Sequence, residues 1–283
     1  MKHETAVSVE RFALNRIACP SLDLDGFYAL AAKAGLRAVE LRNDLPGGQV
    51  VDGLAPARAV EAAEKHGVRV VTINALQKFD LAAERPRAME ELERLLDLAA
   101  AIRCPAIVLC PTNDTGDRRS PEARREETVG ALRAFAPAFS SRGLLGYVEP
   151  LGFEECALRS AVGAAAAVRS SGASCYRIVL DTFHHYLGPD GMEDLGSAYD
   201  VSMTGLVHVS GVEAPLPKEQ LRDPHRILPG PRDRMDSRGQ IARLLARGYR
   251  GDISFEPFSP EVQRTGPEAL VAALRASVEH LAA

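Results

Sequence analysis

The cysteines of this sequence lack the arrangement that would make them a disulfide framework or a thiolate metal site. They are odd in number, scattered along the chain and without any Cys-x-x-Cys pair. This pattern suits buried thiols in a reducing cytoplasm. The five residues are Cys19, Cys104, Cys110, Cys156 and Cys175.

The sequence also lacks a segment that would place it in or across a membrane. Residues 1–11 are polar and charged, without the apolar core that a secretory signal requires. The alanine-rich run at 161–168 is much shorter than the roughly 20 residues that span a bilayer. We therefore expect a cytoplasmic protein with no membrane partner.

An excess of positive charge and a glycine-rich phosphate loop are missing as well. The formal net charge is -4, whereas proteins that bind a phosphate backbone usually present a basic surface. Nucleic acid is therefore not an expected partner. No G-x-G-x-x-G motif follows the first β-rich run, which argues against an open, doubly wound sheet that binds a dinucleotide.

A recurring pattern is present instead: a stretch with helical spacing, then a glycine, then a short β-rich run. Glycine ends a helix at little cost because it adopts the left-handed conformation without a Cβ clash. Apolar strands that follow helices are typical of a parallel sheet covered on both faces. The glycines and the runs after them are Gly35 before 38–41, Gly67 before 68–73, Gly143 before 144–149 and Gly248 before 252–256.

Eight β-rich runs can be counted, and each is followed by a helical stretch. Phe27, Leu30, Ala31 and Ala34, for example, have helical spacing after a candidate cap at Asp23. The simplest architecture is a single-domain α/β fold over residues 1–283, a (β/α)8 TIM barrel, for which about 250 residues is typical. The runs are 12–18, 38–41, 68–73, 106–110, 144–149, 177–181, 205–209 and 252–256.

One connection is unusually long, the proline-rich and charged loop 210–236. Loops of this length in a compact domain are usually functional, and we expect this one to fold over the mouth of the barrel.

The last four runs end in side chains that can bind a metal: Glu149, Asp181, His208 and Glu256. The carboxyl ends of all strands in such a barrel open onto one face, where active sites lie. Any one of these residues alone is more simply a loop residue, a helix cap or a hydrogen-bonded histidine. Four consecutive strands that end this way predict a site for one divalent cation, because the carboxylates would otherwise repel one another. Oxygen-rich ligation with one histidine suits Mn²⁺ first, with Mg²⁺, Co²⁺ or Zn²⁺ as alternatives.

Two further residues are candidates for the same site. His184 lies three residues beyond Asp181, close enough to face the same cavity, and Arg226 lies in the long loop, from which a cation could reach a bound substrate.

These residues resemble the xylose isomerase-like barrels, a superfamily of sugar isomerases and epimerases. Within it the chain is most similar to the inosose (2-keto-myo-inositol) isomerases. The elements that carry the resemblance are Ala13-Leu14-Asn15-Arg16, Val39-Glu40-Leu41-Arg42, Asn74-Ala75-Leu76, Glu149-Pro150-Leu151-Gly152, Leu180-Asp181-Thr182-Phe183-His184, His208, Arg226 with Pro229-Gly230, and Phe255-Glu256.

The resemblance implies an isomerase that moves a carbonyl between adjacent carbons of an inosose through an enediolate. In that case the four residues at the strand ends bind the metal, Glu149 and Glu256 also act as the acid/base pair, and His184 and Arg226 contact the substrate. The chain departs from the pattern at Phe153, where some inosose isomerases carry a histidine, and at Lys78 with Asp80, which replace a more apolar stretch. Both differences bear on the identity of the substrate.

Other functions fit the same pattern. A ketose 3-epimerase or a hydroxypyruvate-type isomerase would share the metal site and the enediolate. A metal-dependent hydrolase resembling abasic-site endonucleases would need more ligands and a basic groove, and a non-catalytic sugar-binding barrel would be free to lose a ligand. The expected partner is a small polyhydroxy ketone, and a homodimer is compatible with the sequence.

Overall fold

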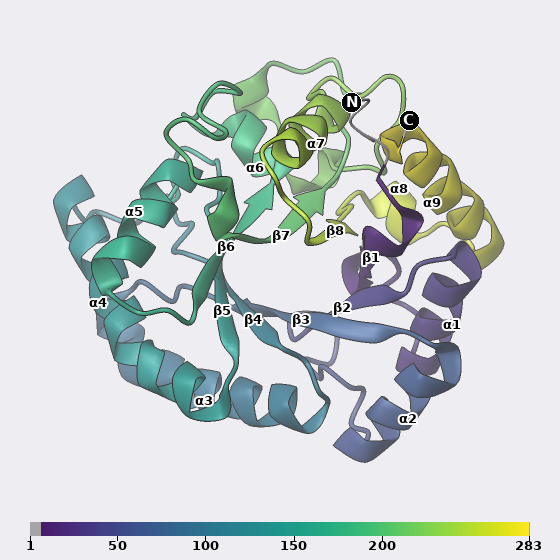
Figure 1. Ribbon diagram of the computed structural model, residues 1–283, viewed down its shortest axis with the longest axis horizontal. Helices are drawn as coiled ribbons and strands as arrows, with labels where there is room; N and C mark the ends of the chain where they lie inside the picture. Colours follow the sequence, from purple (N-terminus) through teal and green to yellow (C-terminus); the bar gives the residue numbers. More distant parts are fainter. Residues whose placement is uncertain (1–6, 283) are drawn as a thin grey trace.

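The structure, a computed structural model, describes residues 7–282 of the chain. Within these residues eight parallel strands form a closed barrel in sequence order, and β1 pairs with both β2 and β8 (Figure 1). The predicted TIM barrel is therefore confirmed. The strands are β1 Phe12–Asn15, β2 Ala38–Arg42, β3 Arg69–Leu76, β4 Ala106–Leu109, β5 Leu145–Val148, β6 Tyr176–Asp181, β7 Thr204–Val209 and β8 Asp252–Phe255.

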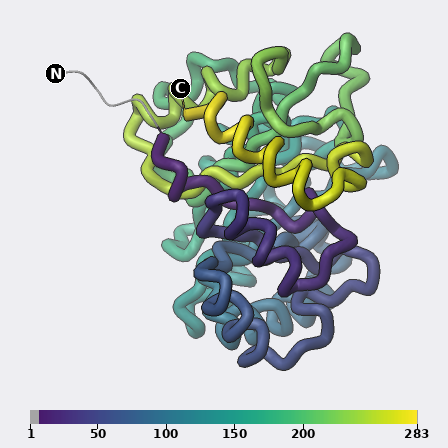
Figure 2. Tube along the Cα trace, turned by 90° about the vertical axis from the view of Figure 1, so that its right-hand side faces the viewer, coloured from purple at the N-terminus to yellow at the C-terminus, as the bar shows by residue number. Residues whose placement is uncertain are grey.

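Helices surround the barrel, and their ends follow the expected chemistry. Asp23 caps α1 by accepting a hydrogen bond from the backbone N of Gly26 at 2.8 Å, and Gly35 ends that helix with φ 90°. The last helix, α9, lies beside α1 where the barrel closes (Figures 1 and 2). Among the described residues no helix is long and apolar enough to cross a membrane. The helices are α1 Leu24–Ala34, α2 Pro56–His66, α3 Arg85–Ala101, α4 Pro121–Arg142, α5 Ala161–Ser171, α6 Thr182–Leu187, α7 Ser237–Ala246, α8 Pro260–Gln263 and α9 Pro267–Ala282.

Two strand ends differ from the expected ones by more than one residue. The first strand stops at Asn15 because the side chain of that residue caps a short 3-10 helix, Arg16–Ala18, by accepting from the backbone N of Ile17 at 3.0 Å. The third strand runs to Leu76, three residues further than expected. Both differences lie at the carboxyl end of the barrel, where the backbone is shaped by local side chains as well as by the sheet.

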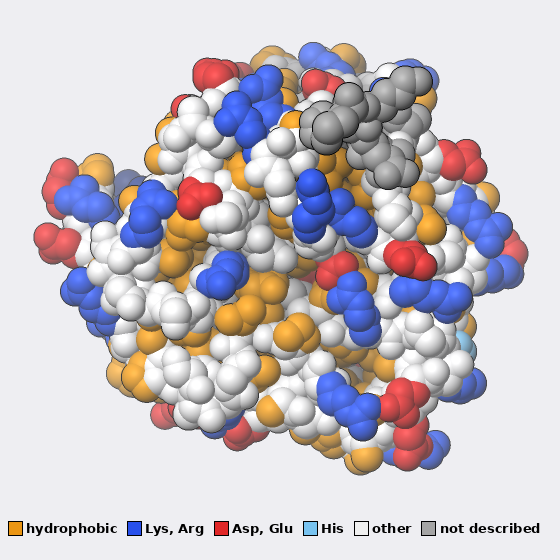
Figure 3. Space-filling view, viewed as in Figure 1, with side chains coloured by type: hydrophobic (Ala, Val, Ile, Leu, Met, Phe, Trp, Pro, Cys, Tyr) orange, Lys and Arg blue, Asp and Glu red, His pale blue; other side chains and the backbone are white. Residues whose placement is uncertain are grey.

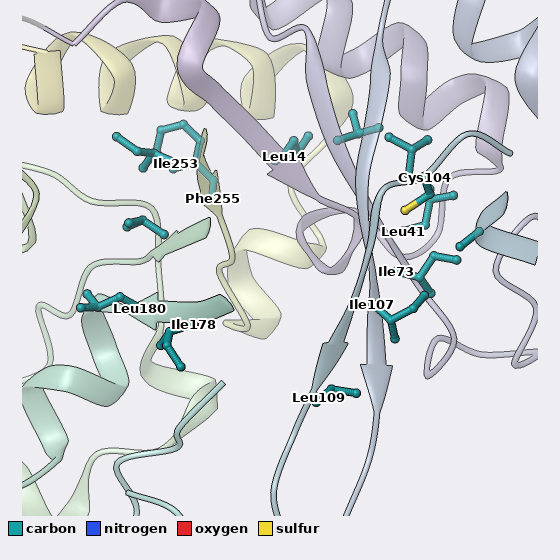
Figure 4. Close-up of a cluster of buried hydrophobic side chains, with 14 of the residues drawn as sticks. Leu14, Leu41, Ile73, Cys104, Ile107, Leu109, Ile178, Leu180, Ile253 and Phe255 are labelled. Carbon is teal, nitrogen blue, oxygen red and sulfur yellow. The ribbon is translucent and has the colours of Figure 1, made fainter. Parts of the chain in front are cut away.

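The apolar side chains form separate layers because successive residues of a strand point to opposite faces. One set, which includes Leu14, Leu41 and Phe255, packs between the barrel and the helices (Figure 4). A second set, which includes Val179 and Leu206, forms a separate cluster inside the barrel. All five cysteines are buried free thiols, as expected.

The long loop after β7 is ordered by its own backbone pairing. Gly211 and Ile227 form an antiparallel bridge, in which the Gly211 N donates to the Ile227 O at 2.7 Å. The backbone N of Ser259, beyond β8, donates to the Arg226 O at 2.8 Å. These contacts hold Arg226 of the loop beside the carboxyl ends of the last strands.

Candidate metal centre

The four residues at the ends of the last strands converge. Each of Glu149, Asp181, His208 and Glu256 offers one ligand atom, and these atoms all lie within 4.8 Å of one another. The alternation of the strands explains the convergence: His208 and Asp181 lie two residues after Leu206 and Val179, which point into the barrel interior. All four residues are at most 3% exposed, so water screens their charges little.

The ring of His208 presents one nitrogen to these carboxylates. Its Nδ1 lies 2.7 Å from Glu149 Oε1, 3.3 Å from Glu256 Oε2 and 4.0 Å from Asp181 Oδ2. Burial alone would lower the pKa of His208, but the carboxylates of Glu256, Glu40 and Glu149 outweigh it and hold that pKa well above its ordinary value. A cation that binds at Nδ1 must therefore displace a proton.

The carboxylates differ in how strongly they are held. Arg226 donates from Nη2 to Asp181 Oδ2 at 2.6 Å and to Glu256 Oε2 at 2.7 Å, and Arg42 donates to Glu256 Oε1 at 2.8 Å. Burial raises the pKa of Glu256, yet His208 and Arg226 reverse this and bring it well below the usual range. Glu149 accepts only from His208 and, at 3.5 Å, from the thiol of Cys110. Three carboxylates and an imidazole nitrogen are a donor set that fits a hard divalent cation.

A cavity of about 400 Å³ opens above the cluster. Glu149 and Glu256 line this cavity, and the rings of Phe153 and Phe258 form apolar parts of its wall. The guanidinium groups of Arg42 and Arg226 lie 5.2 and 4.7 Å from the centre of the Phe258 ring, within cation–π range. The cavity therefore combines charged groups with aromatic surface, as small-molecule sites commonly do.

The two further candidates, His184 and Arg226, both line this cavity. Arg226 is buried and takes part in the cluster itself. His184 is packed edge-on against Phe153 and Phe183, with ring centres 5.1 and 5.3 Å apart, and its Nδ1 has no hydrogen-bond partner. Burial, reinforced by the charge of Arg226, lowers the pKa of His184 to about 4. The ring is thus neutral at physiological pH, with a free polar atom for a ligand.

Replacing His184 with phenylalanine should make the stability of the protein less sensitive to acid. The folded pKa of about 4 lies below the ordinary 6.5, so the unfolded chain binds the proton more readily and the wild-type protein loses stability as the pH falls through this window. The loss approaches about 3 kcal/mol, at about 1.4 kcal/mol per pH unit. Urea denaturation of both proteins at pH 7 and pH 4.5 measures it.

The contribution of His208 is common to both proteins and cancels from this comparison. His280→Phe, at a partly exposed position on α9, is the control and should retain the acid sensitivity of the wild type. An equal loss of stability in the wild type and in His184→Phe would contradict the assigned pKa.

Several site residues were not predicted as such from the sequence. Asn15, Glu40, Arg42 and Asn74 lie on the first three strands and contact the cluster directly or through one another. A signal did exist for Glu40 and Arg42, because charged residues inside a short buried strand are rare unless they are paired. The sequence placed Glu40 in the expected strand and Arg42 directly after it, but it did not show their partners across the barrel.

The residues that depart from the inosose isomerase pattern occupy different places in the structure. Phe153 lines the cavity and contacts His184, and Lys78 lines it while pairing with Asp114 at 3.1 Å. Asp80 is wholly buried and accepts from the backbone N and hydroxyl of Thr112, at 2.6 and 2.8 Å. Phe153 and Lys78 can therefore affect a substrate directly, whereas Asp80 supports the loop after β4.

Comparisons with known proteins agree with this architecture. A family model described as the xylose isomerase-like TIM barrel matches residues 28–282. A xylose isomerase domain containing protein from Salmonella typhimurium LT2 is 37% identical, with a TM-score of 0.90 over 97% of this chain and 98% of that one. None of the curated proteins matches the chain.

More distant structures share the fold. The IOLI protein, solved with a bound zinc atom, is 19% identical, with a TM-score of 0.87 over 96% of this chain and 98% of that one. The D-psicose 3-epimerase of Clostridium cellulolyticum H10, solved with D-tagatose, is 17% identical, with a TM-score of 0.75 over 95% and 97%. At these identities the likeness concerns the fold alone.

Proposed function

The chain belongs to the xylose isomerase-like TIM barrel family, and we propose that it is a metal-dependent isomerase that moves a carbonyl between adjacent carbons of an inosose. The observation that carries the proposal is the placement of two glutamates, Glu149 and Glu256, on one buried four-ligand cluster beneath one cavity. Carbonyl migration requires removing a proton from one carbon and returning one to its neighbour, and two carboxylates beside one cavity can carry out these two transfers.

The residues at the strand ends would hold one divalent cation, Mn²⁺ in the first instance. A bound cation supplies Lewis-acid polarisation of the substrate carbonyl. The IOLI protein, which shares this fold, was solved with a bound zinc atom, and this supports a metal here and makes Zn²⁺ the main alternative. The experiment therefore compares Mn²⁺ with Zn²⁺.

The protein's own groups perform the proton transfers. One of Glu149 and Glu256 takes the carbon-bound proton to give an enediolate, and the other, after taking a proton from solvent, delivers it to the former carbonyl carbon. The hydroxyl proton of the first carbon passes to the former carbonyl oxygen, which leaves the new carbonyl on the first carbon. Arg226, which is always charged, lies at the cavity and can donate to a substrate hydroxyl or to the developing oxyanion. His184, neutral and with an unpartnered Nδ1, hydrogen-bonds a substrate oxygen.

A neutral polyhydroxy ketone suits the charges of this cavity. Each arginine or lysine that lines it is paired with a carboxylate: Arg42 with Asp44, Lys78 with Asp114 and Arg226 with Asp223. A phosphate or carboxylate on the substrate would have to displace one of these partners. Basic and acidic side chains are interspersed over the face shown in Figure 3, without a continuous basic patch on that face.

Incubation with 2-keto-myo-inositol in D₂O tests the proposal. The purified protein is compared with Mn²⁺, with Zn²⁺ and with excess chelator, and the products are followed by NMR. We expect a rearranged inosose with deuterium at the exchanged carbon, formed only when metal is present, because the proton removed equilibrates with solvent on the carboxylate.

Other outcomes redirect the assignment. Exchange without rearrangement, or turnover of a ketose in place of the inosose, would keep the proton chemistry and indicate a 3-epimerase or a hydroxypyruvate-type isomerase. No exchange from the inosose or from a panel of ketoses, despite bound metal, would overturn the isomerase and favour a hydrolase or a sugar-binding barrel.

A further inference from the structure

Strand β2 carries a buried carboxylate that the proposed mechanism does not use. Glu40 is wholly buried, and its Oε2 lies 3.0 Å from Nε2 of His208. The hydroxyl of Thr72 donates to the same oxygen, and Nδ2 of Asn15 donates to Oε1 at 3.3 Å. Burying a charge destabilises a protein unless the charge is well partnered. The partners of Glu40 therefore indicate what the residue does.

The two nitrogens of His208 face opposite partners. Nδ1 faces the carboxylates of Glu149, Glu256 and Asp181, and Nε2 faces Glu40 alone. A neutral imidazole carries one proton, and the nitrogen that binds a cation must be the one without it. For Nδ1 to act as the ligand, the proton must therefore be on Nε2 and point at Glu40.

The surrounding hydrogen bonds determine what Glu40 can accept. Oδ1 of Asn15 accepts from the backbone N of Ile17 at 3.0 Å, so the amide NH₂ of Asn15 is the group that faces Glu40. Both oxygens of Glu40 thus meet donors. A group that only accepts hydrogen bonds fits this position, and an ionised carboxylate is such a group.

We propose that Glu40 is a positioning residue of the metal centre: it accepts the Nε2 proton of His208 and thereby leaves the Nδ1 lone pair free for the cation. The inference rests on the proposed function, because it assumes that the cluster binds metal. The same amide group of Asn15 also donates to Glu256 Oε1 at 3.2 Å, so it couples the orientation of Glu40 to that of a second ligand.

Glu40→Gln keeps the shape of the side chain and removes its acceptor-only character. If the amide oxygen faces His208, the NH₂ meets the NH₂ of Asn15. If the amide is turned over, its NH₂ faces Nε2 and favours the tautomer with the proton on Nδ1, which blocks the ligand position. The first arrangement keeps the metal-binding tautomer only at the cost of two opposed NH₂ groups, and the second disfavours that tautomer directly.

The measurement uses Zn²⁺ as the probe, since it is diamagnetic. We expect the affinity of Glu40→Gln for Zn²⁺ to fall by about 10- to 100-fold, the usual effect of losing the carboxylate partner of a ligating histidine. In ¹⁵N NMR spectra, His208 of the Zn²⁺-loaded wild type should show a protonated Nε2 and a metal-bound Nδ1. In the metal-free proteins, at a pH where His208 is neutral, the variant should show more of the form with its proton on Nδ1 than the wild type does.

Two control variants separate positioning from general destabilisation. Thr72→Val removes one hydroxyl bond and keeps the carboxylate, so the affinity for Zn²⁺ should change by less than about fivefold. Tyr176→Phe removes a buried hydroxyl that donates to the Leu132 O at 2.7 Å, between β6 and α4. It should lower the melting temperature and leave the affinity for Zn²⁺ unchanged.

An unchanged affinity and tautomer in Glu40→Gln would overturn the inference while leaving the proposed function intact. If that variant does not fold, the wild type still decides, because a metal-bound Nε2 and a protonated Nδ1 would exclude the assigned role of Glu40. A wild type that binds no Zn²⁺ or Mn²⁺ would instead contradict the proposed function itself.

Discussion

Glu149→Gln should abolish turnover, with a loss of about 10³-fold or more. The substitution removes a proton carrier, worth about 10²- to 10⁴-fold alone, and it also removes one of the three charges that hold the cation. The measurement is the rate of inosose rearrangement in the presence of saturating Mn²⁺, together with the number of metal ions bound per chain. Glu90→Gln, at an exposed position on α3, is the control and should behave as the wild type.

Glu256→Gln should have the same effect on turnover and a larger effect on stability. Glu256 accepts from Arg42, Arg226, Asn15 and Asn74, whereas Glu149 has only His208 and the thiol of Cys110 as partners. A glutamine amide among these donors leaves buried N–H groups opposed to one another. Full turnover in either variant would show that the glutamate concerned is not part of the acid/base pair.

Arg226→Ala should destabilise the metal-free protein by about 3–5 kcal/mol, the usual cost of removing one partner from a buried ion pair. Arg226 is 1% exposed and bonds both Asp181 and Glu256. Urea denaturation with chelator and with Mn²⁺ should show a smaller loss when metal is bound, because the cation then compensates the same carboxylates.

The variant should also turn over substrate more slowly while still binding one metal ion per chain, since all four ligands remain. Arg232→Ala, in the same loop, is a matched control. The side chain of Arg232 is 83% exposed and pairs with Glu213, so its removal should cost about 0–1 kcal/mol. Loss of the metal from Arg226→Ala would contradict the role assigned to this residue and make it part of the binding site.

The eight strands, the closed barrel and the convergence of four ligands were all predictable from the amino-acid sequence. The periodicity of strands and helices and the glycines between them are local properties of the chain. The sequence of each element is therefore enough to predict its type and its approximate position. The candidate ligands could be identified because each one lies at or next to the end of its own strand, and because the carboxyl ends of all strands in a barrel meet on one face. The carboxyl ends of β1 and β3 were not predictable in this way. At β1, for example, the end of the strand is decided by the side-chain cap that Asn15 forms.

Only the tertiary structure could show how the first half of the barrel supports the site in the second. Glu40 and His208 lie on strands far apart in sequence, and their contact depends on closure of the barrel and on which ring nitrogen faces which side. Arg226 could be assigned to the loop over the mouth from the sequence, but its bonds to Asp181 and Glu256 depend on the path of that loop. Buried charges pair when they lie close together in space, and the pattern of residues along the chain does not give that distance.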